Sequence, residues 1–588
     1  MVLSIIKKND KRGISLVEAI LGAALFGMLA TALAGAWLYG EESQVIVGNR
    51  ARALYSSDEG LEAARNIRDS GWSNLTAGEH GLATTTNQWN LSGTSSSIDI
   101  FNQHLSIALV DTKRKTVTST VTWQQNMLRS GTVDLVTRLT NWRARGGGGG
   151  GGMLVFGNGG VATDTIRYRT IDSSGTWSAL ATTADVDTGS TNKALRAVRI
   201  YVNPIRNEKI IISRHYASVG TSQTIYAQVY NGDTSSWGNV NTLSSWSAST
   251  YLDVQNFDGF YLQNGDFVAV YSDNSTIPKM KVWNGSTWSA QVSMQNIGGI
   301  PNYIVANVRP GTSEAMVVFF DAQRDTNSEY YDGAGYTTAD WTLHTEHSAT
   351  APVVTKRMVD FAWNGSDTTK GLLVFSNNAN DRSTRYKVWI ADGSGAGSWT
   401  TADNGANQGG SGTRLGVLRA LGQPNATNFL DCSQNTIPQV ICYRHDTLNI
   451  HTNPANQIVA ATTDAGIQKA FDFAYELANA SYAIVVYSDA TSIPKLKLYN
   501  LSTNAFDVSA MSIGALTGSL KTVRTISKPF SDDIMILLGD AGNMMYSIVW
   551  DGTNHTTYAT PAGYNLINHG SLGSAVEDYW YDFAWDLL

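Results

Sequence analysis

The sequence predicts a multidomain protein in which a long N-terminal α-helix and a small antiparallel sheet precede an all-β propeller. Three observations support this prediction. The first 70 residues contain an apolar run followed by helical spacing, seven consecutive glycines occupy residues 146–152, and similar segments recur from residue 153 to the end. A helical period, a flexible tether and a repeated strand pattern thus mark successive parts of the chain.

The N-terminus combines a basic segment with a long apolar run. Four basic residues stand between positions 7 and 12, and no charged side chain occurs from residue 19 to residue 39. This run approaches the ~20 apolar residues that cross a bilayer as a helix, and the basic flank should stay in the cytoplasm. Everything after residue 40 is expected to be exported. Glu18, beside the apolar run, is costly in a membrane and should have a partner.

Residues 13–18, Gly-Ile-Ser-Leu-Val-Glu, resemble the prepilin leader of type IV pilins and pseudopilins. The resemblance implies that residues 1–13 are a leader, that prepilin peptidase cuts between Gly13 and Ile14, and that Ile14 becomes the often N-methylated terminus. It also implies that Glu18 pairs with the terminal amine of a neighbouring subunit during assembly. Ile14 departs from the commoner Phe, and Gly35 stands where many pilins have Pro. The alternative is an ordinary signal anchor with a chance acid.

The helix predicted from residue 14 should continue to about Arg68, because residues 43–68 contain no Pro and keep a helical apolar period. Its domain is assigned to residues 14–70. Residues 71–145 read as short strands in which polar and apolar residues alternate. A helix on a small antiparallel sheet is the arrangement that the pilin resemblance implies. The glycines at 146–152 predict a flexible linker of roughly 15 Å.

Residues 153–588 repeat with a period of about 54 residues. The clearest copies, YSDNSTIPKMKVWNGSTW from Tyr271 and YSDATSIPKLKLYNLSTN from Tyr487, lie 216 residues apart, which is four periods. Eight units of this length predict a propeller of eight four-stranded blades. The domain begins with a second-strand pattern, MLVF, and ends on a first-strand pattern, YDFAW. The C-terminal strand should therefore complete the first blade and close the ring.

Charged residues alternate along the first strands of these units. Four units carry an Asp before apolar or aromatic residues, and the intervening four carry an Arg followed by Pro one or five residues later. In chain order the positions are Arg199, Asp258, Arg309, Asp360, Arg419, Asp472, Arg524 and Asp582. If these strands line the propeller axis, the residues form an ion-pair ring. The ring either satisfies its own charges in a narrow centre or lines a channel that also binds a ligand.

The composition indicates a globular, lightly charged, strand-rich protein. Charged residues make up 15% of the chain, the net charge is −7, and no basic cluster occurs outside the leader, so we expect no nucleic-acid partner. Cys432 and Cys442 are ten residues apart, which suits a hairpin disulfide in an oxidising compartment. A two-ligand metal site is the alternative, but no His or Cys cluster completes a tetrahedron.

The sequence offers no catalytic set, since no unit supplies a general acid and base pair; we expect no enzyme activity, cofactor or metal. We predict a minor or tip type IV pilin-like subunit that displays its propeller outside the cell for adhesion or recognition. Its partners would be prepilin peptidase, other pilin subunits, the inner membrane before assembly, and a surface ligand, either glycan or protein. The alternatives are a pseudopilin of a secretion or uptake machine and a membrane-tethered extracellular enzyme acting on glycans or polymers.

Overall fold

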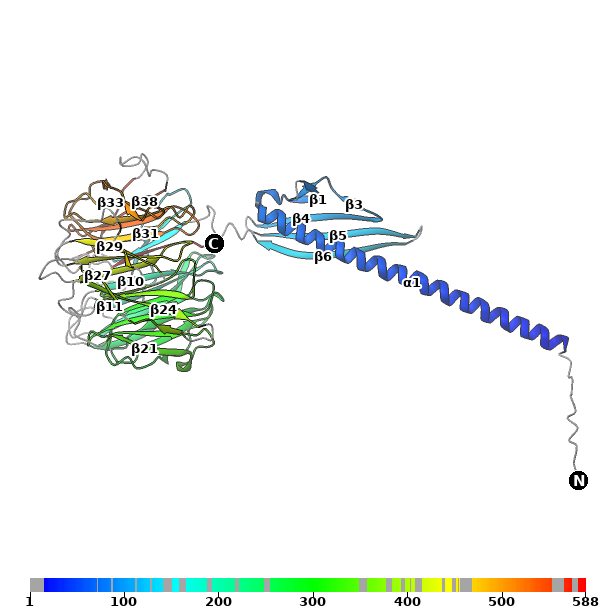
Figure 1. The fold of residues 1–588 in the computed structure, drawn as a ribbon, viewed down its shortest axis with the longest axis horizontal. Helices are drawn as coiled ribbons and strands as arrows, with labels where there is room; N and C mark the ends of the chain where they lie inside the picture. Colours follow the sequence, from blue (N-terminus) through cyan, green and yellow to red (C-terminus); the bar gives the residue numbers. More distant parts are fainter. Residues whose placement is uncertain are drawn as a thin grey trace, which may run out of the picture. The chain divides into compact units, whose positions relative to one another are not determined.

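The structure of the chain is a computed structural model. It describes residues 15–587 except 71, 86–87, 112–113, 127–128, 141–150, 158–164, 188–192, 217–221, 248–253, 348–356, 377–382, 393–396, 402, 408–414, 436–438, 447–450, 453, 455–467, 553–564 and 574–579. The chain divides into two compact units, residues 1–144 and 145–588 (Figure 1), and each is described by itself. Gly13 and Ile14, the predicted processing site, lie outside the described residues.

Unit 1 begins with α1 (Leu16–Ser70), a single continuous helix that ends close to the predicted end at Arg68 (Figure 1). Its N-terminus is capped by its own side chains. Ser15 Oγ accepts a hydrogen bond from the Glu18 N–H at 3.1 Å, and the Glu18 carboxylate accepts one from the Ser15 N–H at 3.0 Å. This reciprocal pair is a capping box, which satisfies N–H groups that have no partner within a helix.

The two halves of α1 have different surroundings. Large apolar side chains of residues 16–47 are exposed, whereas the buried helix residues lie within positions 53–67. Ser57 Oγ donates to the Ser119 carbonyl at 2.7 Å, and a Cβ atom at Gly60 would lie 2.4 Å from Ser119 Oγ. The lack of a side chain at Gly60 therefore lets the helix approach the sheet. Among the described residues, α1 is the one helix long and apolar enough to cross a membrane.

A six-stranded antiparallel sheet covers the second half of α1. Its strands are β1 (Gly78–Thr85), β2 (Gln88–Ser92), β3 (Ser96–Ile98), β4 (Phe101–Asp111), β5 (Arg114–Asn126) and β6 (Arg129–Thr140). The order is β2-β1-β4-β5-β6, with β3 paired to β4, and η1 (Trp72–Asn74) follows the helix. Burial alternates along β5, so that Val117 and Val121 contribute to the core. The strands β4, β5 and β6 fall on the alternating segments from which the sequence predicts strands.

Unit 2 consists, in the part of the chain that the structure describes, of eight antiparallel sheets of four or five strands. The first three are β10 (Ala194–Val202), β11 (Glu208–Tyr216), β12 (Ser222–Asn231) and β13 (Ser236–Ser247); β14 (Phe257–Tyr261), β15 (Phe267–Tyr271), β16 (Lys279–Trp283) and β17 (Val292–Ser293); and β18 (Pro301–Val308), β19 (Ala315–Asp321), β20 (Thr326–Tyr331) and β21 (Trp341–His347), the last preceded by η3 (Thr338–Asp340).

The next four sheets follow in chain order. They are β22 (Val359–Trp363), β23 (Lys370–Phe375), β24 (Ser383–Ala391), β25 (Gly397–Trp399) and β26 (Asp403–Asn407); β27 (Leu415–Gly422), β28 (Phe429–Asn435), β29 (Val440–His445) and β30 (His451–Thr452); β31 (Phe471–Tyr475), β32 (Tyr482–Tyr487), β33 (Lys495–Asn500), β34 (Ala505–Phe506) and β35 (Met511–Ser512); and β36 (Leu520–Ser527), β37 (Ile534–Asp540), β38 (Met544–Trp550) and β39 (Ile567–Ser571).

The eighth sheet joins the two ends of unit 2. Its order is β40 (Tyr581–Trp585), β7 (Gly152–Phe156), β8 (Arg167–Ile171) and β9 (Ala181–Thr182). Gly151 and Gly152, which the sequence predicts as linker, belong to this sheet, because the Asp586 N–H donates to the Gly151 carbonyl at 2.9 Å and β7 starts at Gly152. A Cβ atom at Gly152 would lie 2.1 Å from the Phe583 ring. The last glycines of the run therefore serve strand packing, and the predicted linker extends too far.

The second strands of the sheets are buried on both faces. β7, β11, β15, β19, β28 and β37 are buried along their whole length. A strand that is covered on both faces reads as a continuous apolar run instead of alternating. Each such strand lies between neighbouring sheets, and this arrangement of repeated four-stranded sheets is the β-propeller architecture that the sequence predicts.

The two clearest repeats adopt the same turn. Asp273 Oδ1 accepts a hydrogen bond from the Ser275 N–H, and Asp489 Oδ1 accepts one from the Thr491 N–H, both at 3.1 Å. Local side-chain hydrogen bonds of this kind define an Asx turn. The repeated sequence is therefore explained by turn chemistry.

The two cysteines lie on neighbouring strands of one sheet. Cys432 on β28 is opposite Cys442 on β29, and the two form a disulfide. Both residues are buried in the hydrophobic core of that sheet. The disulfide therefore crosslinks a hairpin within unit 2.

Candidate functional site

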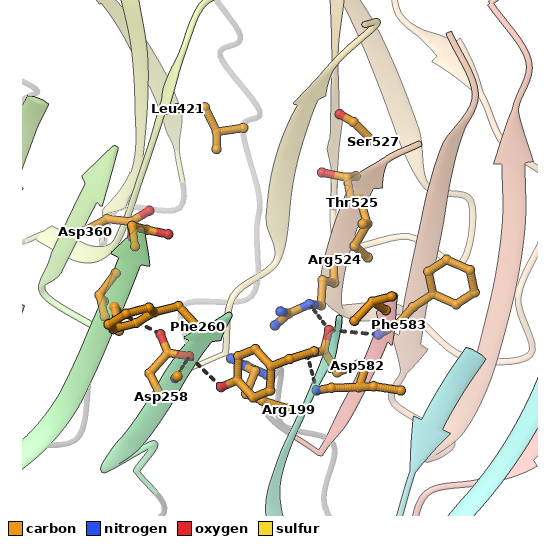
Figure 2. A pocket seen from close by; sticks show the side chains of 18 of the residues that line it. Arg199, Asp258, Phe260, Asp360, Leu421, Arg524, Thr525, Ser527, Asp582 and Phe583 are labelled. Atoms are coloured by element: carbon orange, nitrogen blue, oxygen red, sulfur yellow. Dashed lines mark hydrogen bonds and ion pairs between the residues drawn. The ribbon is translucent and has the colours of Figure 1, made fainter. Parts of the chain in front are cut away.

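The first strands of the eight sheets surround one cavity of about 630 Å³ (Figure 2). Lining residues come from β10, β14, β18, β22, β27, β31, β36 and β40. The volume falls in the range of ~300–1,000 Å³ that is usual for small-molecule sites. Seven of the eight residues predicted as a charged ring line it: Arg199, Asp258, Asp360, Arg419, Asp472, Arg524 and Asp582.

The four aspartates of the cavity share one geometry. Each accepts, at Oδ2, a hydrogen bond from a backbone N–H of the first strand in the next sheet. The donors are Ala306 to Asp258 at 3.0 Å, Ala420 to Asp360 at 2.9 Å, Thr525 to Asp472 at 2.9 Å, and Ile200 to Asp582 at 3.1 Å. At every second junction between neighbouring sheets, an aspartate of one first strand therefore accepts a backbone hydrogen bond from the next first strand.

Arginines connect these aspartates. Arg419 reaches carboxylates on both sides, with Nη1 at 3.3 Å from Asp360 Oδ2 and Nε at 3.2 Å from Asp472 Oδ1. Arg524 Nε lies 2.7 Å from Asp582 Oδ1, as the dashed line in Figure 2 marks. At these positions the arginines pair with aspartates of neighbouring sheets, which is the arrangement that the sequence predicts.

Arg309 does not line the cavity, and its predicted place in the ring is wrong. It follows the end of β18, forms an ion pair with Glu314, and donates from Nε to the Thr368 carbonyl at 2.7 Å. The hydrogen bond from Ala306 to the preceding aspartate identifies Val305 as the residue in the arginine position.

The number of residues between the arginine position and the following proline could have identified Val305 from the sequence. Each of the three ring arginines that line the cavity is followed by Pro after five residues, whereas Pro310 follows Arg309 directly. Pro310 lies five residues after Val305. The constant spacing therefore points to Val305, although its side chain carries no charge.

Two cations of the cavity are absent from the predicted ring. Arg357 Nη2 lies 2.7 Å from Asp360 Oδ1, and Lys469 Nζ lies 2.9 Å from Asp472 Oδ2. Each cation precedes its aspartate by three residues, an odd spacing that in an extended strand places side chains on opposite faces. Both residues stand before the start of their strands, β22 and β31, so strand alternation does not apply to them.

The cations set the charge state of the buried acids. Burial would raise the pKa of Asp472, but Lys469 and Arg419 outweigh it and lower this pKa to about 2. At Asp360, too, burial would raise the pKa, but Arg357 and Arg419 outweigh burial and lower this pKa. Burial raises the pKa of Asp258, since the Tyr201 hydroxyl and backbone N–H groups offset only part of it. Arg199 also lowers the pKa of Asp258, but less than burial raises it.

Arg199 and Asp258 are also held by neutral groups. Arg199 Nη1 donates to the Val198 carbonyl at 3.1 Å, and Nη2 donates to the side-chain oxygen of Gln255. The Tyr201 hydroxyl donates to Asp258 Oδ1 at 2.6 Å. Arg199 and Asp258 are therefore held partly by hydrogen bonds to neutral groups, and the alternating charge pattern of the sequence does not predict these hydrogen bonds.

Glu18, the predicted assembly residue, has a partner in its own chain. The capping box with Ser15 explains locally why an acid stands at the start of α1. The Ser-x-x-Glu spacing at a helix start was the available signal for this role. Across the part of the chain that the structure describes, no group of three or more His, Cys, Asp or Glu residues could hold a metal ion.

No protein-family model matches the chain, and no curated protein matches it. Similar solved structures include the BP39L lectin from Burkholderia pseudomallei, with 11% identity over 61% of this chain and 96% of the lectin and a TM-score of 0.42. The Dos1 propeller shares 9% identity over 72% of this chain and 95% of its own, with a TM-score of 0.42. A fungal alcohol oxidase in complex with copper shares 12% identity over 67% and 74%, with a TM-score of 0.35. These similarities are too weak to support an argument about the activity of this chain.

Proposed function

We propose that the chain is a minor or tip pilin-like subunit of a type IV pilus-like filament, which displays a β-propeller outside the cell for adhesion or recognition. The observation that carries this proposal is α1, whose first half exposes apolar side chains while its second half packs on an antiparallel sheet. An uncovered apolar helix needs a membrane or neighbouring helices around it. The inner membrane would cover it before assembly, and the filament afterwards.

Processing would act on the start of the same helix. Prepilin peptidase would remove residues 1–13 and leave Ile14 as the new terminus, close to Ser15 and Glu18. In the single chain the Glu18 carboxylate accepts from the neutral Ser15 N–H. The terminal amine of a neighbouring subunit is a stronger partner for a carboxylate, because a hydrogen bond between charged groups is about twice as strong as a neutral one.

We further propose that the eight sheets form the blades of a closed propeller. The supporting contacts lie on both sides of β40. The Tyr581 hydroxyl donates to Thr522 Oγ1 on β36 at 2.8 Å, and Trp585 Nε1 donates to the Ile526 carbonyl at 3.1 Å. On its other side, Asp582 accepts from Ile200 on β10. The last strand thus contacts both the final and the first complete sheet.

We propose that the cavity binds a ligand and does not catalyse a reaction. A general acid or base needs a carboxyl group that exchanges protons near the working pH. Asp360 and Asp472 have lowered pKa values because nearby cations outweigh burial, and each uses one oxygen for a backbone N–H. These carboxylates are therefore committed to holding the sheets together.

The mature N-terminus tests the processing step. Mass spectrometry of protein recovered from surface filaments should find Ile14 as the first residue, because the peptidase would cut after Gly13. Chains that begin at Met1, or that are cut beyond Tyr39, would contradict the pilin assignment.

Glu18→Val tests the assembly step. The variant should be cleaved normally but fail to enter filaments, because it loses the carboxylate that pairs with a neighbouring amine, together with one hydrogen bond of the capping box. Glu41→Val, at the far end of the apolar run, is the matched control and should assemble. Immunogold labelling of surface filaments with antibody to unit 2 measures the incorporation. Normal incorporation of Glu18→Val would count against the amine pairing.

A further inference from the structure

The charges of the central cavity differ in their exposure. The side chains of Asp360, Asp472 and Asp582 are at most 3% exposed. Those of Arg419 and Arg524 are 22% and 21% exposed. Near Arg419 and Arg524, a molecule inside the cavity therefore meets guanidinium N–H groups, while the oxygens of Asp360, Asp472 and Asp582 lie behind them.

Both arginines have donors to spare. A guanidinium group carries five N–H groups. Arg419 uses Nε and Nη1 for its two aspartates, and Arg524 uses Nε for Asp582. Within the described ranges these side chains make no other hydrogen bond. Each therefore keeps terminal N–H groups that can donate to an acceptor in the cavity.

A hydroxyl group of the same wall also lacks a partner. Thr525 lines the cavity next to Arg524 (Figure 2), and its N–H donates to Asp472. Its Oγ1 is buried and has no hydrogen-bond partner among the residues that the structure describes. Because this oxygen is covered by the protein, it adds no contact to a molecule in the cavity, and the exposed donors of this wall are those of the arginines.

The side chains of the wall carry one positive charge in excess. Four carboxylates face five cations, which are Arg199, Arg357, Arg419, Lys469 and Arg524. An excess charge in a partly enclosed site attracts a counter-ion of opposite sign. The balance therefore favours a ligand with one negative charge.

The wall beyond the charged residues is neutral. Leu421 and Ser527 lie farther along the cavity than Arg199 and Asp258 (Figure 2), and Asn307 also lines it. Amide, hydroxyl and apolar groups occur together there. A mixed wall of this kind suits a polyhydroxylated ring, which presents both hydroxyl groups and an apolar face.

We infer that the central cavity binds a small sugar that carries a carboxylate, held by the guanidinium groups of Arg419 and Arg524. A planar guanidinium matches the geometry of a carboxylate, and one excess charge matches a monoanion better than a phosphate dianion. This inference rests on the proposed recognition role and deepens it by naming the class of ligand. Binding by the purified chain needs no filament, so a failed titration leaves the filament assignment standing.

Calorimetric titration of the full chain in detergent with glucuronate tests the ligand class. We expect saturable binding of glucuronate and at least about tenfold weaker binding of glucose, which has the same ring but no carboxylate. Equal binding of glucose, tighter binding of inorganic phosphate, or no binding of glucuronate at about 10 mM would overturn the inference.

Substitutions in the cavity test the two arginines. Arg524→Gln should weaken glucuronate binding by about 10- to 100-fold, the effect of losing a charge-assisted hydrogen bond. Arg309→Gln, outside the cavity, is the matched control and should bind normally. Wild-type affinity in Arg524→Gln would overturn the assignment.

A gain of charge gives an independent test if Arg524→Gln fails to fold. Val305→Arg places a cation at the position that Arg199, Arg419 and Arg524 occupy in the other sheets. It should tighten glucuronate binding by about two- to fivefold while glucose binding stays unchanged. Unchanged or weaker glucuronate binding in a folded Val305→Arg protein would overturn the inference.

Discussion

The cavity aspartates differ, residue by residue, in the charge of the groups that donate to them. Asp472 is contacted by Arg419 and Lys469, and although burial opposes them, these cations lower its pKa to about 2. Asp258 accepts from the Tyr201 hydroxyl and from backbone N–H groups, and burial raises its pKa. The aspartate at this position therefore serves mainly as the counter-ion of two cations in the case of Asp472, and mainly as a hydrogen-bond acceptor in the case of Asp258.

Asparagine substitutions should separate these two roles. Asp472→Asn removes the buried carboxylate that Lys469 and Arg419 both contact, and should cost about 3–5 kcal/mol of unfolding free energy at pH 7. Asp258→Asn loses mainly hydrogen bonds and should cost about 1 kcal/mol. The contribution of ionised Asp472 is present above its ordinary pKa of 3.8 and lost as the pH falls toward 2. Urea unfolding measures both variants, and equal losses would contradict the assignment.

Glu329 on β20 is a buried acid of a different kind. The Gln295 N–H donates to its Oε2 at 3.2 Å, while its Oε1 is buried and has no partner in the described part of the chain. Burial raises its pKa to about 8, from 4.5. The folded protein therefore holds a proton at neutral pH that the unfolded chain releases, and the stability tied to this group declines as the pH rises from 4.5 to 8.

Glu329→Gln should stabilise the protein at neutral pH, because glutamine needs no proton to enter the core. The gain in unfolding free energy should approach about 4 kcal/mol at about pH 7.5 and fall below about 1 kcal/mol at about pH 5. Urea unfolding of wild type and variant at both pH values checks this. A difference that does not change with pH would show that Glu329 is ionised in the folded protein.

Among the secondary-structure elements, α1 contains glycines in opposite surroundings. A Cβ atom at Gly48 would meet nothing within 4 Å, whereas at Gly60 it would lie 2.4 Å from Ser119 Oγ and 2.5 Å from Gln103 Nε2. Glycine weakens a helix interior unless a close approach requires it. Gly60 is thus part of the contact between helix and sheet, and Gly48 is not.

Alanine at these two positions should act in opposite directions. Gly48→Ala should stabilise the helix by about 0.5–1 kcal/mol, and Gly60→Ala should destabilise unit 1 by about 1–3 kcal/mol because the added methyl group must displace the side chains of Ser119 and Gln103. Circular dichroism at the helical band follows the melting of α1 in detergent. Shifts of the same sign for both variants would contradict the close contact at Gly60.

On the scale of the whole molecule, β40 connects the two ends of unit 2. It pairs with β7, and its residues Tyr581, Phe583 and Trp585 are buried in a core shared with neighbouring sheets. Chain ends usually fray unless they are tied into a sheet. The stability of unit 2 therefore depends on its last strand.

Deletion of residues 577–588 should lower the melting temperature of unit 2 strongly. Each large apolar side chain contributes about 1.5–3 kcal/mol on burial, so the loss rivals the 5–15 kcal/mol stability of a typical domain. Tryptophan fluorescence of the full chain on heating measures the effect, with removal of Leu588 alone as the control. An unchanged melting temperature would contradict the proposed closed ring.

Local patterns in the sequence determined much of this protein. The helical period predicted α1 to within a few residues, and the repeat predicted successive four-stranded sheets. The unmatched strand patterns at the two ends predicted the pairing of β40 with β7. These features follow from the sequence because the side-chain period, the recurrence of similar segments and the incomplete units at the two ends can all be recognised in the order of residues.

The tertiary structure alone decided how charge is distributed in the cavity. It placed Val305 instead of Arg309 in the ring, and it brought Arg357 and Lys469 to the aspartates. It also drew Gly152 into a strand against the Phe583 ring. These outcomes depend on the register between sheets far apart in sequence, and a shift of one residue turns a side chain to the opposite face. Which charges a ligand can reach is therefore settled by packing, because burial covers Asp360, Asp472 and Asp582 and leaves the side chains of Arg419 and Arg524 partly exposed.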